Sequence, residues 1–131
     1  SSDTPADALP HLVHAASLYS GTFMESDIYT DWLLPVRESY KQKYIQVLEA
    51  MDAAYASQDD VTAQIDVNKK ILDADACHES AHKQLMKLYN QSGQRHLAAR
   101  QFAYAKEKLN KELDIPPGEE LQKLAQELKG L

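Results

Sequence analysis

The chain has one cysteine among its 131 residues, and only four glycines and five prolines. A single cysteine excludes the internal disulfide framework that small secreted domains use, and it suits a reducing compartment. Few glycines and prolines leave little material for the turns of a sheet, whereas 44% apolar residues are enough to build one core. These features favour an all-α fold in a single domain that covers residues 1–131.

Long hydrophobic runs are missing as well. No apolar stretch approaches the ~18 to 20 residues of a membrane helix, and the N-terminus lacks the basic and apolar regions of a signal peptide. We therefore expect a cytoplasmic protein with no membrane partner. The net charge of -6 disfavours direct binding to duplex DNA. Because the chain opens on Ser1 rather than Met, we expect a fragment of a longer protein.

Two segments 34 residues apart share a pattern, which indicates an internal repeat. Tyr55 aligns with Tyr89, and the turn at Asp59 aligns with the turn at Gly93. A period of 34 residues is that of the tetratricopeptide (TPR) repeat, a helical hairpin that stacks on its neighbours. Since stacked repeats present surfaces to other molecules, the pattern points to binding rather than to catalysis.

Hydrophobic periodicity and capping residues predict about six antiparallel helices. The first covers 5–19 and ends at Ser20-Gly21, and an ordered loop follows over 21–31, with Asp31 as the N-cap of the next helix. The other helices are expected at 32–57, 60–74, 77–92, 95–113 and 118–129. Because their connections are short, successive helices should be antiparallel neighbours, and the last should act as a C-terminal capping helix.

Five segments resemble the bacterial transcriptional activator domain of antibiotic-regulatory-protein (SARP) type activators and related response regulators. They are LYSGTF at 18–23, DW at 31–32 with RE at 37–38, AHKQLM at 81–86, GQR to QF at 93–102, and ELDIPPGEEL at 112–121. Their order and spacing are similar to those of the family over about 16–128. The chain departs from the family at Asp59, where glycine is common, and at Ala76, where proline is common.

This resemblance implies a TPR-like regulatory domain that follows a winged-helix DNA-binding domain and supports oligomerisation or signal transduction. The implied partners are proteins, either a second copy in a homodimer or the transcription machinery, and DNA is contacted only through a missing N-terminal domain. The alternative is a free-standing TPR-type adaptor that binds an acidic peptide segment. A winged-helix pattern upstream in the parent protein would favour the first interpretation.

Residues 78–82 match H-E-x-x-H, in which two histidines one turn apart bind zinc and the glutamate activates water. The family alignment instead places His82 at an inward packing position and His78 in an exposed first turn. Packing is the favoured interpretation, and a metallopeptidase is the alternative. Cys77 has no histidine and aspartate partners assigned for nucleophilic catalysis, so a small apolar filler is its favoured role.

We therefore expect no catalytic residues, no metal and no cofactor. One helix face is a candidate partner groove, because its residues project beside the inward positions of the helix over 77–92. Its residues are Lys83, Lys87, Asn90 and Gln91. This basic, amide-lined strip would suit a carboxylate or an acidic peptide, and an ordinary polar helix face is the alternative.

Overall fold

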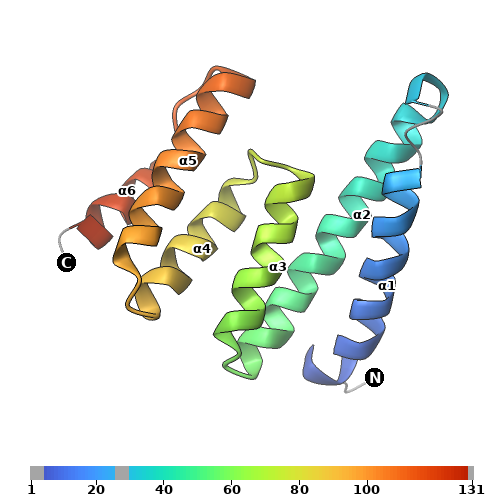
Figure 1. Ribbon diagram of the computed structural model, residues 1–131, viewed down its shortest axis with the longest axis horizontal. Coiled ribbons are helices and arrows are strands. Elements are labelled where there is room, and N and C mark those ends of the chain that lie inside the picture. The colour runs from blue at the N-terminus through green and yellow to red at the C-terminus, as the bar shows by residue number, and fades with distance from the viewer. Residues whose placement is uncertain (1–4, 26–29, 130–131) are drawn as a thin grey trace. The chain divides into compact units, whose positions relative to one another are not determined.

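The computed structural model describes residues 5–25 and 30–129, which are mostly helical (Figure 1). The helices are α1 (Pro5–Glu25), α2 (Thr30–Ser57), α3 (Val61–Ala74), α4 (Glu79–Gln91), α5 (Arg95–Leu113) and α6 (Glu119–Lys129). These residues contain no strand, so the predicted all-α class is confirmed. The chain divides into two compact units, Ser1–Val67 and Asn68–Leu131, and the boundary falls inside α3.

The first helix boundary differs from the sequence prediction. α1 continues through Ser20-Gly21 to Glu25, and α2 begins at Thr30, so Asp31 lies inside α2 and is not its N-cap. Residues 26–29 of the predicted loop lie outside the described residues. A single glycine costs a helix only about 1 kcal/mol relative to alanine. This cost is small enough for Gly21 to be accommodated inside α1, so the glycine does not by itself end the helix.

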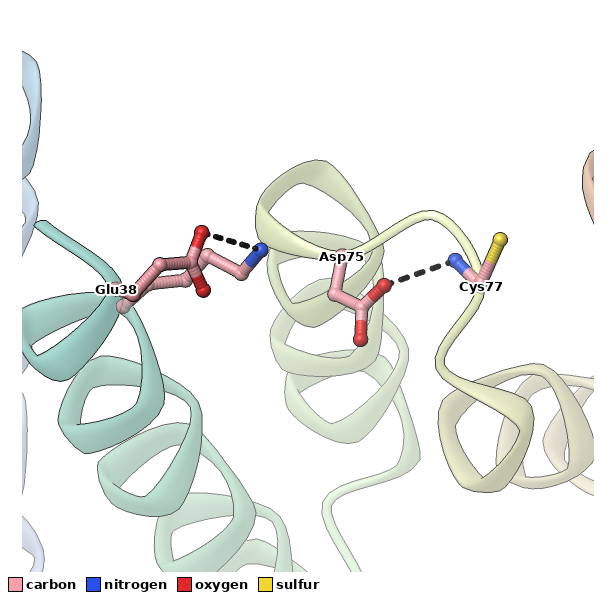
Figure 2. A network of polar contacts seen from close by, with 4 residues as sticks. Glu38, Asp75 and Cys77 are labelled. Atoms are coloured by element: carbon pink, nitrogen blue, oxygen red, sulfur yellow. Dashed lines mark hydrogen bonds and ion pairs between the residues drawn. The ribbon is translucent and has the colours of Figure 1, made fainter. Parts of the chain in front are cut away.

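The first unit is built around the pairing of α1 with α2, which lie side by side (Figure 1). Its core along α2 consists of Ile45, Leu48, Met51 and Ala54, which recur at intervals of three residues. Gln64 of α3 is also buried, and its Nε2 donates a hydrogen bond to Asp52 Oδ1 of α2 at 3.2 Å. On the exposed side of α2, Lys41 forms an ion pair with Glu38 at 3.5 Å (Figure 2).

The second unit contains the hairpin of α4 and α5, with α6 packed against both helices (Figure 1). Its buried apolar residues are Ile71, Leu72, Ala81, Leu85, Met86, Leu88, Tyr89, Ala98, Ala105, Leu109, Leu121 and Leu124. Ile71 and Leu72 lie at the end of α3, and the other residues come from α4, α5 and α6. The last helix therefore packs on the preceding hairpin, as the sequence predicts.

The 34-residue period is reproduced in the backbone of two turns. Asp59 has φ of 55° and Gly93 has φ of 77°, so both aligned residues adopt the left-handed conformation. The N–H of Asp60 donates to the carbonyl of Tyr55 at 3.0 Å, and the N–H of Gln94 donates to the carbonyl of Tyr89 at 2.7 Å. Both bonds span five residues, as in the Schellman motif that ends many helices. The equivalence predicted between these turns is therefore confirmed.

No helix within residues 5–25 and 30–129 combines the length and the apolar composition needed to cross a bilayer.

The left-handed turn at Asp59 yields a stability prediction. An L-residue with positive φ is strained, whereas glycine is not, so Asp59→Gly should raise the free energy of unfolding by about 0.5 to 1 kcal/mol. Gly93→Ala should lower it by about 1 kcal/mol. No atom lies within 4 Å of a Cβ at Gly93, so that loss would come from the backbone alone. Urea denaturation followed by circular dichroism measures both, and a loss of stability in Asp59→Gly would contradict the assignment.

Candidate functional site

The first residue of the H-E-x-x-H motif serves as the N-cap of α4. His78 has φ of -72° and ψ of 95°, outside the helical region, and its Nδ1 accepts a hydrogen bond from the N–H of Ala81 at 3.1 Å. This bond satisfies one of the N–H groups that the first turn of a helix leaves without a partner. The sequence placed His78 inside that first turn, and the structure places it immediately before the helix.

The last residue of the motif, His82, has no exposed surface. Its Nε2 lies 2.8 Å from the carbonyl oxygen of Ala76, and its Nδ1 lies 2.7 Å from Nε2 of Gln101 on α5. Since a carbonyl can only accept, Nε2 carries the hydrogen and Nδ1 accepts from the Gln101 amide. Both ring nitrogens form hydrogen bonds inside the protein, and the side chain is buried. The predicted inward position of His82 is therefore confirmed.

The environment of His82 keeps its imidazole neutral. Burial is the main cause that lowers the pKa of His82, and the charge of a protonated His78 acts in the same direction. The bond to Ala76 and the carboxylates of Glu79 and Asp75 oppose this shift without reversing it. The Tyr104 ring also faces the imidazole, with the two ring centroids 5.6 Å apart.

The central Glu79 of the motif caps a different helix. Its Oε2 accepts a hydrogen bond from the N–H of Gly118 at 2.9 Å, and the carbonyl of Gly118 accepts from the N–H of Gln122 in the first turn of α6. A carboxylate at this position is stabilised by the positive end of the α6 dipole. One turn further along α4, Lys83 Nζ pairs with Glu120 Oε2 at 3.1 Å. Together these contacts hold the start of α6 against α4.

The three motif residues therefore each contact a helix end or a neighbouring helix. Within the described part of the chain, no group of three or more His, Cys, Asp or Glu side chains is placed to hold a metal ion. The described residues therefore give the metallopeptidase alternative no support.

Cys77 lies beside the last turns of α5 and is half-buried. Its Sγ donates to Glu112 Oε2 at 3.3 Å and lies 3.6 Å from the carbonyl oxygen of Lys108. Burial and then the contact with Glu112 raise the pKa of the Cys77 thiol to about 11. Asp75 Oδ1 accepts from the backbone N–H of Cys77 at 3.1 Å (Figure 2). The thiol is therefore protonated near neutral pH and is a poor nucleophile.

The second unit contains a cavity of about 800 Å³ between α5 and α6, which we call the α5–α6 groove. Its lining residues are Met86, Asn90, Arg95, His96, Ala98, Ala99, Phe102, Lys106, Pro116, Pro117, Gln122, Ala125, Gln126 and Leu128. Among these residues, Met86, Ala98 and Pro117 are buried. Arg95 and Lys106 are exposed, and the described residues of the lining include no Asp or Glu.

The predicted partner strip on α4 is distributed over two environments. Asn90 lines the α5–α6 groove, whereas Lys83, Lys87 and Gln91 do not. Lys83 is engaged with Glu120, and Lys87 and Gln91 are exposed. The structure therefore does not gather the four residues into one cavity, and a role for them in partner binding stays a prediction.

Sequence reasoning missed most of the groove residues. A signal for them is present in α5, where Arg95, Ala98, Ala99, Phe102 and Lys106 recur at intervals of three and four residues and so share one helix face. That spacing predicts a common face, but it does not reveal whether another helix covers it.

Comparison with known families decides the identity of the domain. Residues 1–129 match the model of the bacterial transcriptional activator domain. The chain belongs to this family. The match covers nearly the whole chain and confirms the family indicated by the five sequence segments. No curated protein and no solved structure gave a match.

The raised pKa of Cys77 predicts slow alkylation. A shift from 9.0 to about 11 lowers the thiolate fraction about 100-fold, so iodoacetamide at about pH 8 should react about 100-fold more slowly with the folded chain than with the unfolded chain. Glu112→Gln should accelerate the reaction only in part, since burial remains. Glu107→Gln on the same helix is the control. Equal rates in the folded and unfolded chains would refute this prediction.

The lowered pKa of His82 predicts acid sensitivity. The unfolded chain binds a proton near the ordinary value of 6.5, and the folded chain does so only at lower pH. His82 therefore has no effect on the pH dependence of stability above about pH 7. As the pH drops below ~6.5, the free energy of unfolding falls by up to about 1.4 kcal/mol per pH unit. Urea denaturation between about pH 7 and 5 measures this slope. His82→Gln should flatten it, and the exposed His96→Gln should not. A slope unchanged in His82→Gln would contradict this assignment.

Proposed function

We propose that this bacterial transcriptional activator domain is a regulatory protein-interaction domain that controls an attached DNA-binding domain. It would do so by binding another protein or a second copy of itself in response to a signal. The observation that carries the proposal is the α5–α6 groove, a largely apolar cavity left open on a helical-repeat scaffold. Helical repeats use such surfaces to bind partners. Membership of the bacterial transcriptional activator domain family supports a role in transcription regulation.

The lining of the groove favours binding over catalysis. Acid–base and nucleophilic catalysis need a nucleophile or a carboxylate within hydrogen-bond reach of a base. Among the described residues that line the groove there is no Asp, Glu, Ser, Thr, Cys or Tyr, and His96 is the only histidine. The candidates outside the groove, Cys77 and the H-E-x-x-H residues, are engaged in capping and packing. These observations support a domain that is not an enzyme.

Partner binding at this domain would act on DNA binding through linkage. A ligand that favours one assembly state of the regulator raises the population of that state by its difference in affinity between the states. Two DNA-binding domains held together gain effective concentration at paired half-sites. The acidic character of the present chain, with 20 Asp and Glu against 14 Lys and Arg, would leave the DNA contacts to the attached domain. A cytoplasmic location is part of this proposal.

The proposal predicts that activation, not intrinsic DNA affinity, depends on this domain. Removing residues 5–129 from the parent regulator should lower transcription from its target promoter roughly 5- to 150-fold, the usual range of allosteric coupling. The separated DNA-binding domain should still bind promoter DNA in a mobility-shift assay.

Two results would contradict the proposal. One is full activation without residues 5–129, and the other is binding of promoter DNA by the 131-residue chain alone. Light scattering of this 14.7 kDa chain over a range of concentrations then identifies the kind of contact. A stable dimer would assign self-association to the domain, and a monomer would assign control to a different partner.

A further inference from the structure

We propose that the α5–α6 groove binds an amphipathic α-helix of a partner protein that carries acidic residues at both ends of its apolar face. This inference rests on the proposed function, because it names the kind of partner that the interaction domain recognises. It concerns a surface different from the predicted strip on α4, with which it shares only Asn90.

The length of the groove suits a helix of about three turns. On α5 the lining extends from Arg95 to Lys106, which are 11 residues apart and therefore about 16 Å apart along the helix axis. The α6 side contributes Gln122, Ala125 and Gln126, again at intervals of three and four. Two helices that each present such a row of side chains can accept the side-chain ridge of a third helix between them.

The side chains along the groove permit close approach of a helix backbone. Ala98, Ala99 and Ala125 are small, whereas Phe102 and Leu128 are larger and only half-buried. Small residues beside larger ones form grooves and ridges, and the apolar side chains of a partner helix can pack into the grooves. Half-buried Phe102 and Leu128 would lose their remaining contact with water when a helix covers them, which favours binding.

The same groove suits a small molecule less well. Pockets for small ligands bury most of the ligand surface. Here Arg95, His96, Lys106, Gln122 and Gln126 are all exposed, so the groove is open to solvent along its sides. An amphipathic helix matches this arrangement, because its polar face remains in water while its apolar face is covered.

Charge indicates the acidic character of the partner. The chain as a whole has a net charge of -6, yet the charged residues in the groove lining are Arg95 and Lys106, one at each end of the α5 row. The described lining residues include no carboxylate that would neutralise these two charges. Opposite charges across an interface fix the register of the partner and exclude partners of the wrong sign. A helix with Asp or Glu near both ends of its apolar face is therefore complementary.

The first test selects ligands without assuming their sequence. The 131-residue chain would be used to select from a displayed library of helical peptides of about 16 residues, a length of ~24 Å that exceeds the α5 row. We expect enriched peptides to have apolar residues at intervals of three and four, with Asp or Glu flanking them. Enrichment of basic or proline-rich extended peptides, or no enrichment at all, would overturn the inference.

The second test locates the site by charge reversal. Arg95→Glu with Lys106→Glu should weaken the selected peptide at least about tenfold in a fluorescence titration. Peptides whose acidic flanks are replaced by Lys should bind this variant and not the original chain. That exchange of specificity shows that the variant is folded. The matched control is Arg100→Glu with Lys111→Glu, since both residues are exposed on α5, lie outside the groove, and give the same change in charge.

The outcomes separate this inference from the proposed function. Equal losses in the groove variant and in the control would indicate non-specific charge attraction and overturn the groove assignment. Loss of binding only in Lys83→Glu with Lys87→Glu would move the site to the α4 strip. If the original chain binds no peptide and the groove variant differs from it in the mass measured by light scattering, a second copy of the chain is the occupant. That result overturns the helix inference and leaves the proposed function intact. If the domain binds the selected peptide but the regulator activates transcription fully without residues 5–129, only the proposed function is refuted.

Discussion

The second unit depends on the buried imidazole of His82. One of its nitrogens donates to the carbonyl of Ala76 in the loop before α4, and the other accepts from Gln101 on α5. A single neutral side chain therefore connects the loop, its own helix and the next helix of the hairpin. An unpaired polar group at such a buried position would cost about 1 to 3 kcal/mol, so the geometry of all three elements is constrained by these two bonds.

The hydrogen bonds of His82 orient α4, and α4 in turn contacts the start of α6. With His82 directed into the core, Glu79 and Lys83 lie on the side of α4 that reaches the start of α6, where they contact Gly118 and Glu120. α6 is thus held at its N-terminal end by charge, and along its length by buried Leu121 and Leu124. The remaining faces of α5 and α6 form the walls of the α5–α6 groove. The contacts that α4 makes with α5 and α6 therefore help to position the two helices that line the candidate binding surface.

The H-E-x-x-H residues illustrate how a short motif can be satisfied by packing alone. The spacing of two histidines and a glutamate suits zinc on one helix face, but here His78 lies before the helix, His82 points into the core and Glu79 caps α6. The same residues lie in or beside the segments that carry the family resemblance. His82 in the segment 81–86 bonds to Gln101 in the segment 93–102, and Glu79 bonds to Gly118 in the segment 112–121. Some of the segments that carry the family resemblance are therefore joined in this structure by contacts between different helices.

The sequence by itself determined the all-α class, the 34-residue period with its turns at Asp59 and Gly93, and the family, because helix propensity, turn residues and motif order are local properties of the chain. The family resemblance also predicted the inward position of His82. The sequence did not determine the end of α1 at Glu25, since one glycine weakens a helix by only about 1 kcal/mol and does not fix where it ends. Nor did it determine the α5–α6 groove, which brings α4, α5, the Pro116-Pro117 loop and α6 together. Only the tertiary structure decides which helix faces are covered, because that depends on contacts between residues far apart in the chain.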